Sequence, residues 1–169
     1  NGVFLTTNEG VSSWTAVNSG LTDTAITALA VMGSNLFAGT YWKGIFRSTN
    51  NGANWTYLNT GLGDVGISAL FVNGTNLYAS TGSDGIFLST NSGTSWSKVN
   101  TGYCATYISC LLTSGSNLFA GSRYGHGAFL TTDDGSNWAD VNNGLTNKYG
   151  EAFASNGSTM FVGTGVGGV

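Results

Sequence analysis

Short apolar runs alternate with clusters of Gly, Asn and Ser along the whole chain. This pattern predicts β-strands joined by turns, and no segment has the sustained period of 3.6 residues that a helix would need. Within one stretch of the chain, the predicted strands lie at 67–72, 76–81, 85–90 and 96–100, and the turns lie at 73–75, 82–84 and 91–93. The first of these runs, ISALFV, is almost continuously apolar, which predicts a strand buried on both faces.

The same pattern occurs four times. It is clearest in the related segments 2–14, 44–55, 85–96 and 127–138, which end in Trp14, Trp55, Trp96 and Trp138. The tryptophan spacing gives a period of 41–42 residues. A period of this size is typical of repeat proteins, in which each unit stacks only on its neighbours. Units of four strands favour an all-β fold of the β-propeller type over an open solenoid, with residues 1–169 as a single propeller domain.

Each unit also carries a specific motif. The segments STNNGANW (48–55), STNSGTSW (89–96) and TTDDGSNW (131–138) match the pattern Ser/Thr-x-Asp/Asn-x-Gly-x-x-Trp, and TTNEGVSSW (6–14) matches it with one additional residue before Trp14. This pattern resembles the Asp box of the Asp-box β-propellers, also called bacterial neuraminidase repeats. The resemblance implies that the box forms the turn between the third and fourth strands of each blade. That family includes sialidases, xyloglucan-degrading hydrolases, sortilin-type receptors and a photosystem II assembly factor, so the resemblance implies a fold rather than one function.

The box has a structural explanation. An Asp or Asn side chain accepts hydrogen bonds from nearby backbone N–H groups, and Gly supplies a positive φ angle. The hydroxyl adds a second local bond, and the Trp covers the turn with apolar surface. Metal or ligand binding by the box Asn and Asp side chains is the alternative, but a structural turn must recur in every unit whereas a binding site need not. We therefore expect no metal site and no cofactor, and we expect all four box tryptophans to be buried and equivalent.

Variation among the units is confined to two sets of loops. The turns between first and second strands barely change, and neither do the boxes. The variable loops join second to third strands (40–44, 81–85, 122–127, 164–168) and fourth strands to the next unit (21–25, 62–66, 103–107, 145–151). In an antiparallel four-stranded blade, both sets emerge on the same face. Binding residues commonly lie on loops held by a rigid scaffold, so this face is the candidate binding site.

These loops are aromatic and mildly polar, and they contain Trp42, the one tryptophan outside the boxes. Flat aromatic rings beside hydrogen-bonding groups suit sugar rings or peptide side chains, so we expect a binding or adhesion module for a glycan or protein ligand. The alternative is that the loops vary because nothing constrains them. The candidate ligand-binding residues are Tyr41, Trp42, Lys43, Asp84, Tyr103, Tyr107, Arg123, Tyr124, His126, Lys148 and Tyr149.

Catalysis is not expected. Glycoside hydrolysis uses two carboxyl groups about 5–10 Å apart. Outside the boxes and strands, the carboxylates are Asp23, Asp64, Asp84 and Glu151. A sialidase-like site would need three arginines, and the chain has only Arg47 and Arg123. A xyloglucanase-like pair, Asp64 with Asp84 or Asp23, keeps a carbohydrate-active hydrolase fragment as the alternative function.

The composition narrows the partners. With 41% hydrophobic residues and a net charge of −3, the chain is not of the disordered class. Its five Lys and Arg residues are scattered, so no basic patch predicts nucleic-acid binding. No apolar stretch reaches the roughly 18–20 residues that span a bilayer, so membrane insertion is not expected. Low lysine content and abundant Asn, Ser and Thr, together with the resemblance, favour an extracellular or periplasmic location.

The repeat phase makes a prediction about closure. The sequence opens with a third strand (2–7) and finishes after a second strand (160–164), so one blade is expected to be split between the two termini. Pairing these segments would remove two strand edges that otherwise invite aggregation. A closed four-bladed ring, a homo-oligomer completing an eight-bladed ring, and a piece of a longer ring are the three alternatives. Because the chain opens within a repeat and lacks a signal peptide, we expect it to be a mature or excised segment.

Overall fold

The computed structural model describes residues 1–7, 9, 13–100, 107–157 and 159–165, and in this part of the chain all regular structure is β. Three sheets have four antiparallel strands, and the two sheets at the ends have two. The sheets are β1–β2 (Phe4–Leu5, Thr15–Ala16), β3–β6 (Ile26–Met32, Asn35–Thr40, Ile45–Ser48, Thr56–Tyr57), β7–β10 (Ile67–Asn73, Asn76–Thr81, Ile86–Ser89, Ser97–Lys98), β11–β14 (Ile108–Ser114, Asn117–Ser122, Gly127–Thr131, Ala139–Asp140) and β15–β16 (Gly150–Asn156, Thr159–Thr164). The predicted four-strand repeat is therefore confirmed, although each fourth strand is only two residues long.

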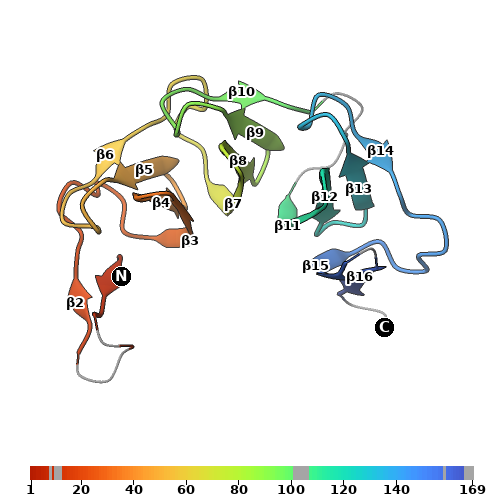
Figure 1. The fold of residues 1–169 in the computed structure, drawn as a ribbon, viewed down its shortest axis with the longest axis horizontal. Coiled ribbons are helices and arrows are strands. Elements are labelled where there is room, and N and C mark those ends of the chain that lie inside the picture. The colour runs from red at the N-terminus through yellow and green to blue at the C-terminus, as the bar shows by residue number, and fades with distance from the viewer. Residues whose placement is uncertain (8, 10–12, 101–106, 158, 166–169) are drawn as a thin grey trace.

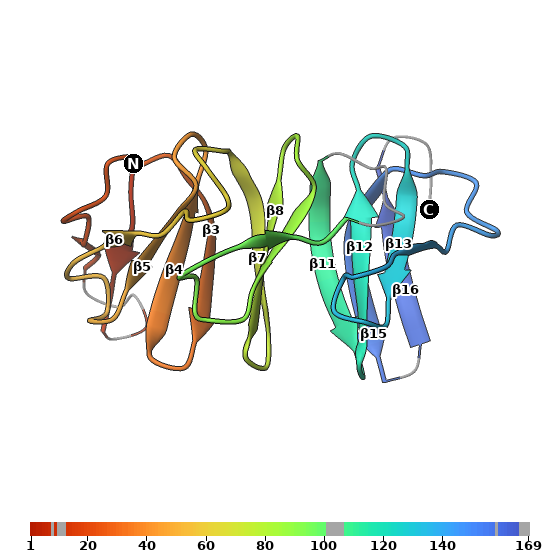
Figure 2. The ribbon, with the colours of Figure 1, turned by 90° about the horizontal axis from the view of Figure 1, so that it is seen from above.

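The sheets stand side by side in an arc (Figures 1 and 2), with the first strands β3, β7, β11 and β15 on the concave side. The short fourth strands β6, β10 and β14 lie on the convex side. Within the described residues the arc does not close, because β1 pairs only with β2 and β16 pairs only with β15. The expected pairing of the N-terminal strand pair with residues 152–164 is therefore not found within one chain.

The first strands differ from the prediction. They were expected to be buried on both faces, but β3 alternates between partly buried and exposed side chains, and β15 is mostly exposed. Leu29 and Val31 are 52% and 64% exposed. The prediction was wrong because these strands line the open concave side of the arc, where no element covers them. The second strands β4, β8 and β12 are the most deeply buried, since they have a sheet neighbour on both sides and a packed sheet against their faces.

The first strands share one irregularity. In β3, β7, β11 and β15, the register shifts at the same position, after the first residue of the strand. In two sheets a serine sits at this bulge and bonds forward to the next sheet: Ser68 Oγ donates to the Ile108 carbonyl oxygen at 2.9 Å, and Ser109 Oγ donates to the Gly150 carbonyl oxygen. The bulge thus re-orients the serine side chain so that it reaches the neighbouring sheet.

The box turns have the expected internal geometry. At the turn between β5 and β6, the Ser48 hydroxyl accepts the Gly52 N–H at 2.8 Å, and the Asn50 side-chain oxygen accepts the Asn54 N–H at 2.9 Å. Asn51 and Gly52 have φ angles of 56° and 84°. The turns at 89–96 and 131–138 repeat these bonds. Asp133 therefore serves the same turn-forming role as its Asn counterparts.

Three of the box tryptophans are buried, but what they cover is the preceding sheet as well as their own turn. Trp55, Trp96 and Trp138 are 5%, 4% and 6% exposed. Their indole N–H groups donate to backbone carbonyls of the preceding repeat, at Val17, Leu58 and Val99 respectively, over 2.7–3.0 Å. Each of these three tryptophans also belongs to one of the three hydrophobic clusters, and each cluster lies between two consecutive sheets. The box therefore joins one sheet to the next.

Trp14 contradicts the expectation of four equivalent tryptophans. Its side chain is 62% exposed. The reason is positional, because the box tryptophan packs on the sheet that precedes its own, and no described sheet precedes β1–β2.

We predict that Trp96→Ala lowers the free energy of unfolding by about 3–5 kcal/mol, the usual range for truncating a buried aromatic side chain. The matched control is Trp42→Ala, because Trp42 is 67% exposed and lies outside the boxes. Urea denaturation followed by far-UV circular dichroism measures both variants. Similar losses in the two would show that box tryptophans do not join the sheets.

Candidate functional site

The two variable loop sets lie side by side, as predicted. In each repeat a backbone hydrogen bond joins them: Tyr41 N–H donates to Ala25 and Arg123 N–H donates to Tyr107, and residues 82 and 165 make the equivalent bonds. We call the surface formed by these loops the variable-loop face. The strand order places the box turns at the other end of each sheet. The variable-loop face therefore differs from repeat to repeat, whereas the box-turn end of each sheet is nearly the same.

A buried asparagine holds the base of the loops that follow the second strands. The Asn59 side-chain oxygen accepts the Ile45 N–H at 2.8 Å, and its amide donates to the Lys43 carbonyl at 2.8 Å. Asn100 and Asn142 make the same pair of bonds in the next two sheets. This role of the asparagines was not predicted, although Asn-x-Gly recurs in the sequence at 59–61, 100–102 and 142–144.

Loops of three consecutive sheets enclose a hollow of about 390 Å³ on the variable-loop face. Its aromatic rings are Tyr41, Tyr107 and Tyr124, and its charged group is Arg123. Gly66, Ser68, Gly82 and Ser83 complete the lining. We call this the tyrosine hollow. Its volume lies in the range of small-molecule sites, and the structure thus brings together four of the residues that the sequence singled out.

Tyr107 adopts a strained conformation to take its place there. Its φ angle is 59°, in the left-handed region that non-glycine residues rarely occupy. The ring meets Tyr124 edge to face at 4.7 Å between centroids, and it lies over Gly82, where an added Cβ would come within 3.2 Å of the ring. Strained backbone of this kind is common at functional sites, and Tyr107 is the positive-φ non-glycine residue that the described chain has outside the box turns, so we keep Tyr107 among the candidate site residues.

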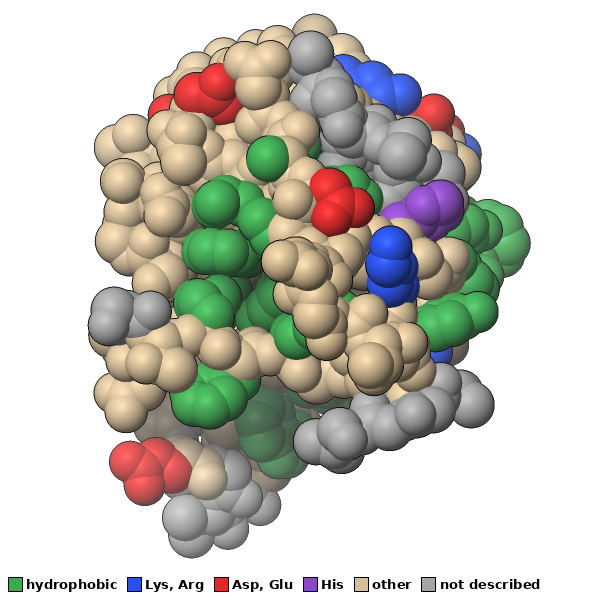
Figure 3. Space-filling view, turned by 90° about the vertical axis from the view of Figure 1, so that its right-hand side faces the viewer, with side chains coloured by type: hydrophobic (Ala, Val, Ile, Leu, Met, Phe, Trp, Pro, Cys, Tyr) green, Lys and Arg blue, Asp and Glu red, His purple; other side chains and the backbone are tan. Residues whose placement is uncertain are grey.

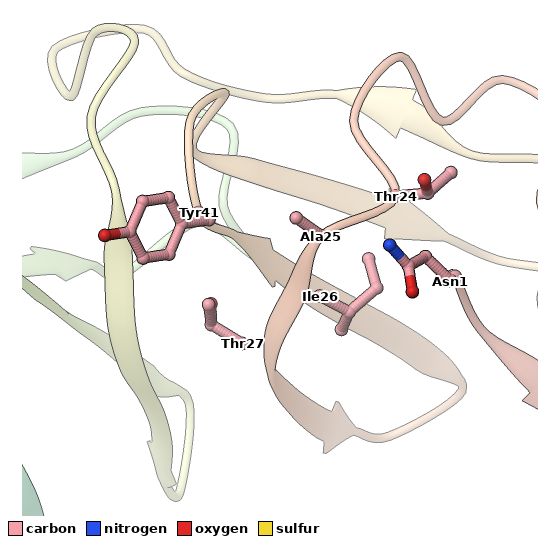
Figure 4. A pocket seen from close by; sticks show the side chains of 7 residues that line it. Asn1, Thr24, Ala25, Ile26, Thr27 and Tyr41 are labelled. Atoms are coloured by element: carbon pink, nitrogen blue, oxygen red, sulfur yellow. The ribbon is translucent and has the colours of Figure 1, made fainter.

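Trp42 lies beside the hollow rather than in its lining. Its ring meets Tyr41 edge to face at 4.4 Å between centroids and is largely exposed. Tyr41 also borders a second hollow of about 360 Å³, where it lies on one side and Asn1 and Thr24 lie on the other (Figure 4). This second hollow contains no other aromatic side chain and no charged one in its lining, so the tyrosine hollow is the better candidate.

The remaining predicted residues do not join the hollow. Lys43 is ion-paired with Asp64 at 2.8 Å, and Asp84 accepts the hydroxyl of Ser83 at 2.9 Å. Tyr149 lies instead against the loop that contains Gly125. His126 and Lys148 contribute backbone carbonyls to that region, and Tyr103 lies outside the described residues.

The carboxylates proposed for hydrolysis are held in structural roles. Hydrogen bonding from Lys43, followed by that from Tyr57, lowers the pKa of Asp64. Partial desolvation by itself raises the pKa of Asp23, but N–H donors from Ala25 and Trp42 together bring it below its usual value. A glycosidase acid needs a raised pKa so that it is protonated when the substrate binds. The pKa values of Asp23 and Asp64 are lowered instead, so both carboxyl groups favour the ionised form.

Among the described residues, no group of three or more His, Cys, Asp or Glu side chains is placed to hold a metal ion. The part of the chain that the structure describes contains no apolar helix of membrane-spanning length. The tyrosine hollow offers a ligand aromatic rings for stacking, hydroxyl groups, and the guanidinium of Arg123. Arg123 lies 3.7 Å from Glu151, and 63% of its side chain is exposed, so it is accessible to a ligand.

Several solved structures share this fold. The extracellular domain assigned to a one-component system of B. thetaiotaomicron has a TM-score of 0.77 at 14% identity, over 97% of this chain and 24% of that one. An ancestral GH74 enzyme has a TM-score of 0.70 at 22% identity, over 83% and 21%. The computationally designed protein Ika4 has a TM-score of 0.65 at 13% identity, over 86% and 88%.

These likenesses show a propeller-type fold. The chain spans about a fifth to a quarter of the two larger proteins, and close to the full length of Ika4. No protein-family model and no curated protein matches the sequence.

We predict that Tyr107→Gly is more stable than Tyr107→Ala by about 1 kcal/mol, because left-handed backbone costs an L-residue roughly 1–2 kcal/mol. Both variants remove the ring, so their difference isolates the backbone. At Tyr124, whose φ is not positive, the same pair should show the ordinary order, with Ala the more stable. Urea denaturation compares the four variants. If Ala is at least as stable as Gly at position 107, the strain does not exist.

Proposed function

We propose that this chain is a non-catalytic Asp-box propeller module that binds a glycan in the tyrosine hollow. The observation that carries the proposal is the convergence of Tyr41, Tyr107 and Tyr124 on one hollow, with Tyr107 held there at a cost in backbone strain. These rings come from three separate loops of the chain, so packing within one loop does not account for their meeting.

The chemistry of the hollow suits a sugar. A pyranose ring presents C–H groups on its faces and hydroxyls around its edge. Tyrosine offers an apolar face with a polar tip at a small cost in side-chain entropy. The Arg123 guanidinium and the neighbouring serine hydroxyls supply hydrogen-bonding groups at the rim. Stacking needs no ion pair, which is consistent with a chain of which only 8% of residues are charged.

The box turns support assignment to the Asp-box family, since the turns at 48–55, 89–96 and 131–138 each combine the hydroxyl, Asn or Asp, Gly and Trp in one geometry. An extracellular or periplasmic location belongs to the same proposal. It is supported by structural neighbours that are extracellular domains of sensor systems. A surface-located glycan is the ligand that such a location makes accessible.

Hydrolysis is the second candidate function, because several structural neighbours are GH74 enzymes, one of them a xyloglucanase from Xanthomonas campestris. Asp64 and Asp23 are each committed to local bonds in this chain, which favours binding without cleavage. A protein ligand is the other alternative, and the structure of YCF48 with a D1 peptide provides a precedent on a related fold.

The proposal predicts binding on an array of plant and bacterial glycans that includes xyloglucan oligosaccharides. Titration of the glycan that binds, followed by NMR, should give a weak dissociation constant, in keeping with one shallow site. Tyr124→Ala should weaken binding at least tenfold, because it removes one stacking face. Tyr124 is 56% exposed, so this change should leave the fold intact.

Tyr57→Ala is the matched control, because Tyr57 is an exposed tyrosine on the outer strand β6. It should leave the affinity unchanged. Release of reducing sugar from the bound glycan would instead support the hydrolase. Absence of any glycan binding at millimolar concentration would overturn the glycan assignment.

A further inference from the structure

Both ends of the arc expose apolar side chains whose counterparts in the other repeats are buried or partly buried. At the N-terminal end, Phe4 is 47% exposed and Trp14 is 62% exposed. At the C-terminal end, Val141 is 37% exposed and Phe161 is 58% exposed. Figure 3 views the C-terminal end and shows hydrophobic side chains gathered across it, with few charged groups among them. Exposed apolar clusters of this kind mark interaction surfaces.

The C-terminal end has an apolar hollow of about 190 Å³ between β11–β14 and β15–β16. It is lined chiefly by hydrophobic side chains: Phe119, Ala128, Val141, Leu145, Phe153, Met160, Phe161 and Val162. Val141 stands at the position of Val17, Leu58 and Val99, whose carbonyls each accept the indole of the following box tryptophan. The hollow therefore corresponds to the place where, in the other repeats, the next box tryptophan packs, and no tryptophan of the described residues fills it.

The N-terminal end has the complementary parts. Each of the three hydrophobic clusters between sheets contains a third-strand phenylalanine together with a box tryptophan: Phe46 with Trp55, Phe87 with Trp96, and Phe129 with Trp138. Phe4 and Trp14 are the equivalent pair of the first repeat. Among the described residues, no sheet precedes β1–β2 for them to pack on.

The sheets at the two ends are also complementary in their strands. The β15–β16 sheet consists of a first and a second strand, and β1–β2 consists of a third and a fourth. The outer edge of β16 and the outer edge of β1 are unpaired within the described residues. Joining them would make a four-stranded sheet like the other three, and would cover two edges that otherwise favour uncontrolled pairing.

We propose that the C-terminal end of one chain binds the N-terminal strand pair of a second copy, so that β16 pairs with β1 and the hollow receives Phe4 and Trp14. The occupant is a second copy because the site reproduces the repeat's own interface, down to the carbonyl that accepts the indole. The same chain's strand pair lies at the far end of the arc (Figure 1), and the three four-stranded sheets separate it from β15–β16.

Two copies related by a two-fold axis satisfy both ends at once. Each contributes three complete sheets and two half-sheets, so the pair forms a closed ring of eight four-stranded sheets. A head-to-tail contact of this kind gives a ring when its rotation closes and a filament when it does not. This inference is independent of the proposed function.

The pairing register follows from β12 and β13, where Phe119 lies opposite Leu130 and Ala120 lies opposite Phe129. By repeat equivalence, Phe161 of one copy lies opposite Leu5 of the other, and Val162 lies opposite Phe4. Directly opposite residues have Cβ atoms about 4.5–5.5 Å apart, close enough for a disulfide with small adjustment. Phe161 and Leu5 are 58% and 38% exposed in one chain, so changing them removes less packing from the single copy than changing a buried residue would.

The test uses the 169-residue chain with Cys104→Ser and Cys110→Ala, alanine being the residue at the equivalent positions 28 and 69. One preparation carries Leu5→Cys and a differently tagged one carries Phe161→Cys. Mild oxidation of their mixture should give a covalent heterodimer. Replacing Phe161→Cys by Val162→Cys is the matched control and should give little, because successive side chains point to opposite faces. Sedimentation of the unaltered chain should give twice its 17.4 kDa mass.

Three results would overturn the proposal. The first is a chain that sediments as a monomer at all concentrations tested, with no crosslinking in the mixture. The second is a variant carrying both cysteines that crosslinks within one chain, which would mean closure by its own strand pair. The third is equal crosslinking by Phe161→Cys and Val162→Cys, which would indicate random collision.

Discussion

The contact on which the rest of the structure depends is the hydrogen bond from a box indole to a carbonyl of the preceding repeat. In the described part of the chain, the β-sheets share no ladder with one another and are held chiefly by packing, and an indole adds a directed bond within each of the three hydrophobic clusters. The box turn serves this contact. Its Gly lets the turn approach the preceding repeat, where a Cβ on Gly52 would come within 2.9 Å of Val17 and one on Gly135 within 3.0 Å of Val99. The Asp-box motif therefore forms a turn and also joins its sheet to the preceding one.

This support explains how the opposite face can vary. The box turns and the asparagines at 59, 100 and 142 fix both ends of each sheet through bonds made inside the scaffold. The variable loops enter the asparagine bonds through backbone carbonyls, so their side chains can change without loss of these bonds. Their freedom allows Tyr107 to remain in a strained conformation beside Tyr124. If two copies form one ring, two tyrosine hollows would lie on a single particle, and a weak site would gain avidity.

The repeat, its four strands, the box turns and the shared face of the variable loops all followed from the sequence, because each depends on contacts within one unit. The errors concern relations between units. The exposure of Trp14 could not be predicted from its own box, since its burial requires a preceding sheet. The partial exposure of β3 depends on the open concave side. Likewise, the sequence identified eleven candidate site residues, but only the curvature of the arc selects Tyr41, Tyr107, Arg123 and Tyr124 as neighbours.

The central claim is that the box tryptophans join consecutive sheets, and hydrogen exchange of the indole N–H groups tests it most directly. NMR of protein labelled with ¹⁵N-tryptophan resolves the exchange of each indole separately. The account predicts strong and similar protection at Trp55, Trp96 and Trp138, whose indoles are bonded and buried, and rapid exchange at the exposed Trp42. Exchange at Trp55, Trp96 and Trp138 as fast as at Trp42 would contradict it, because the sheets would then be held together by something other than the box.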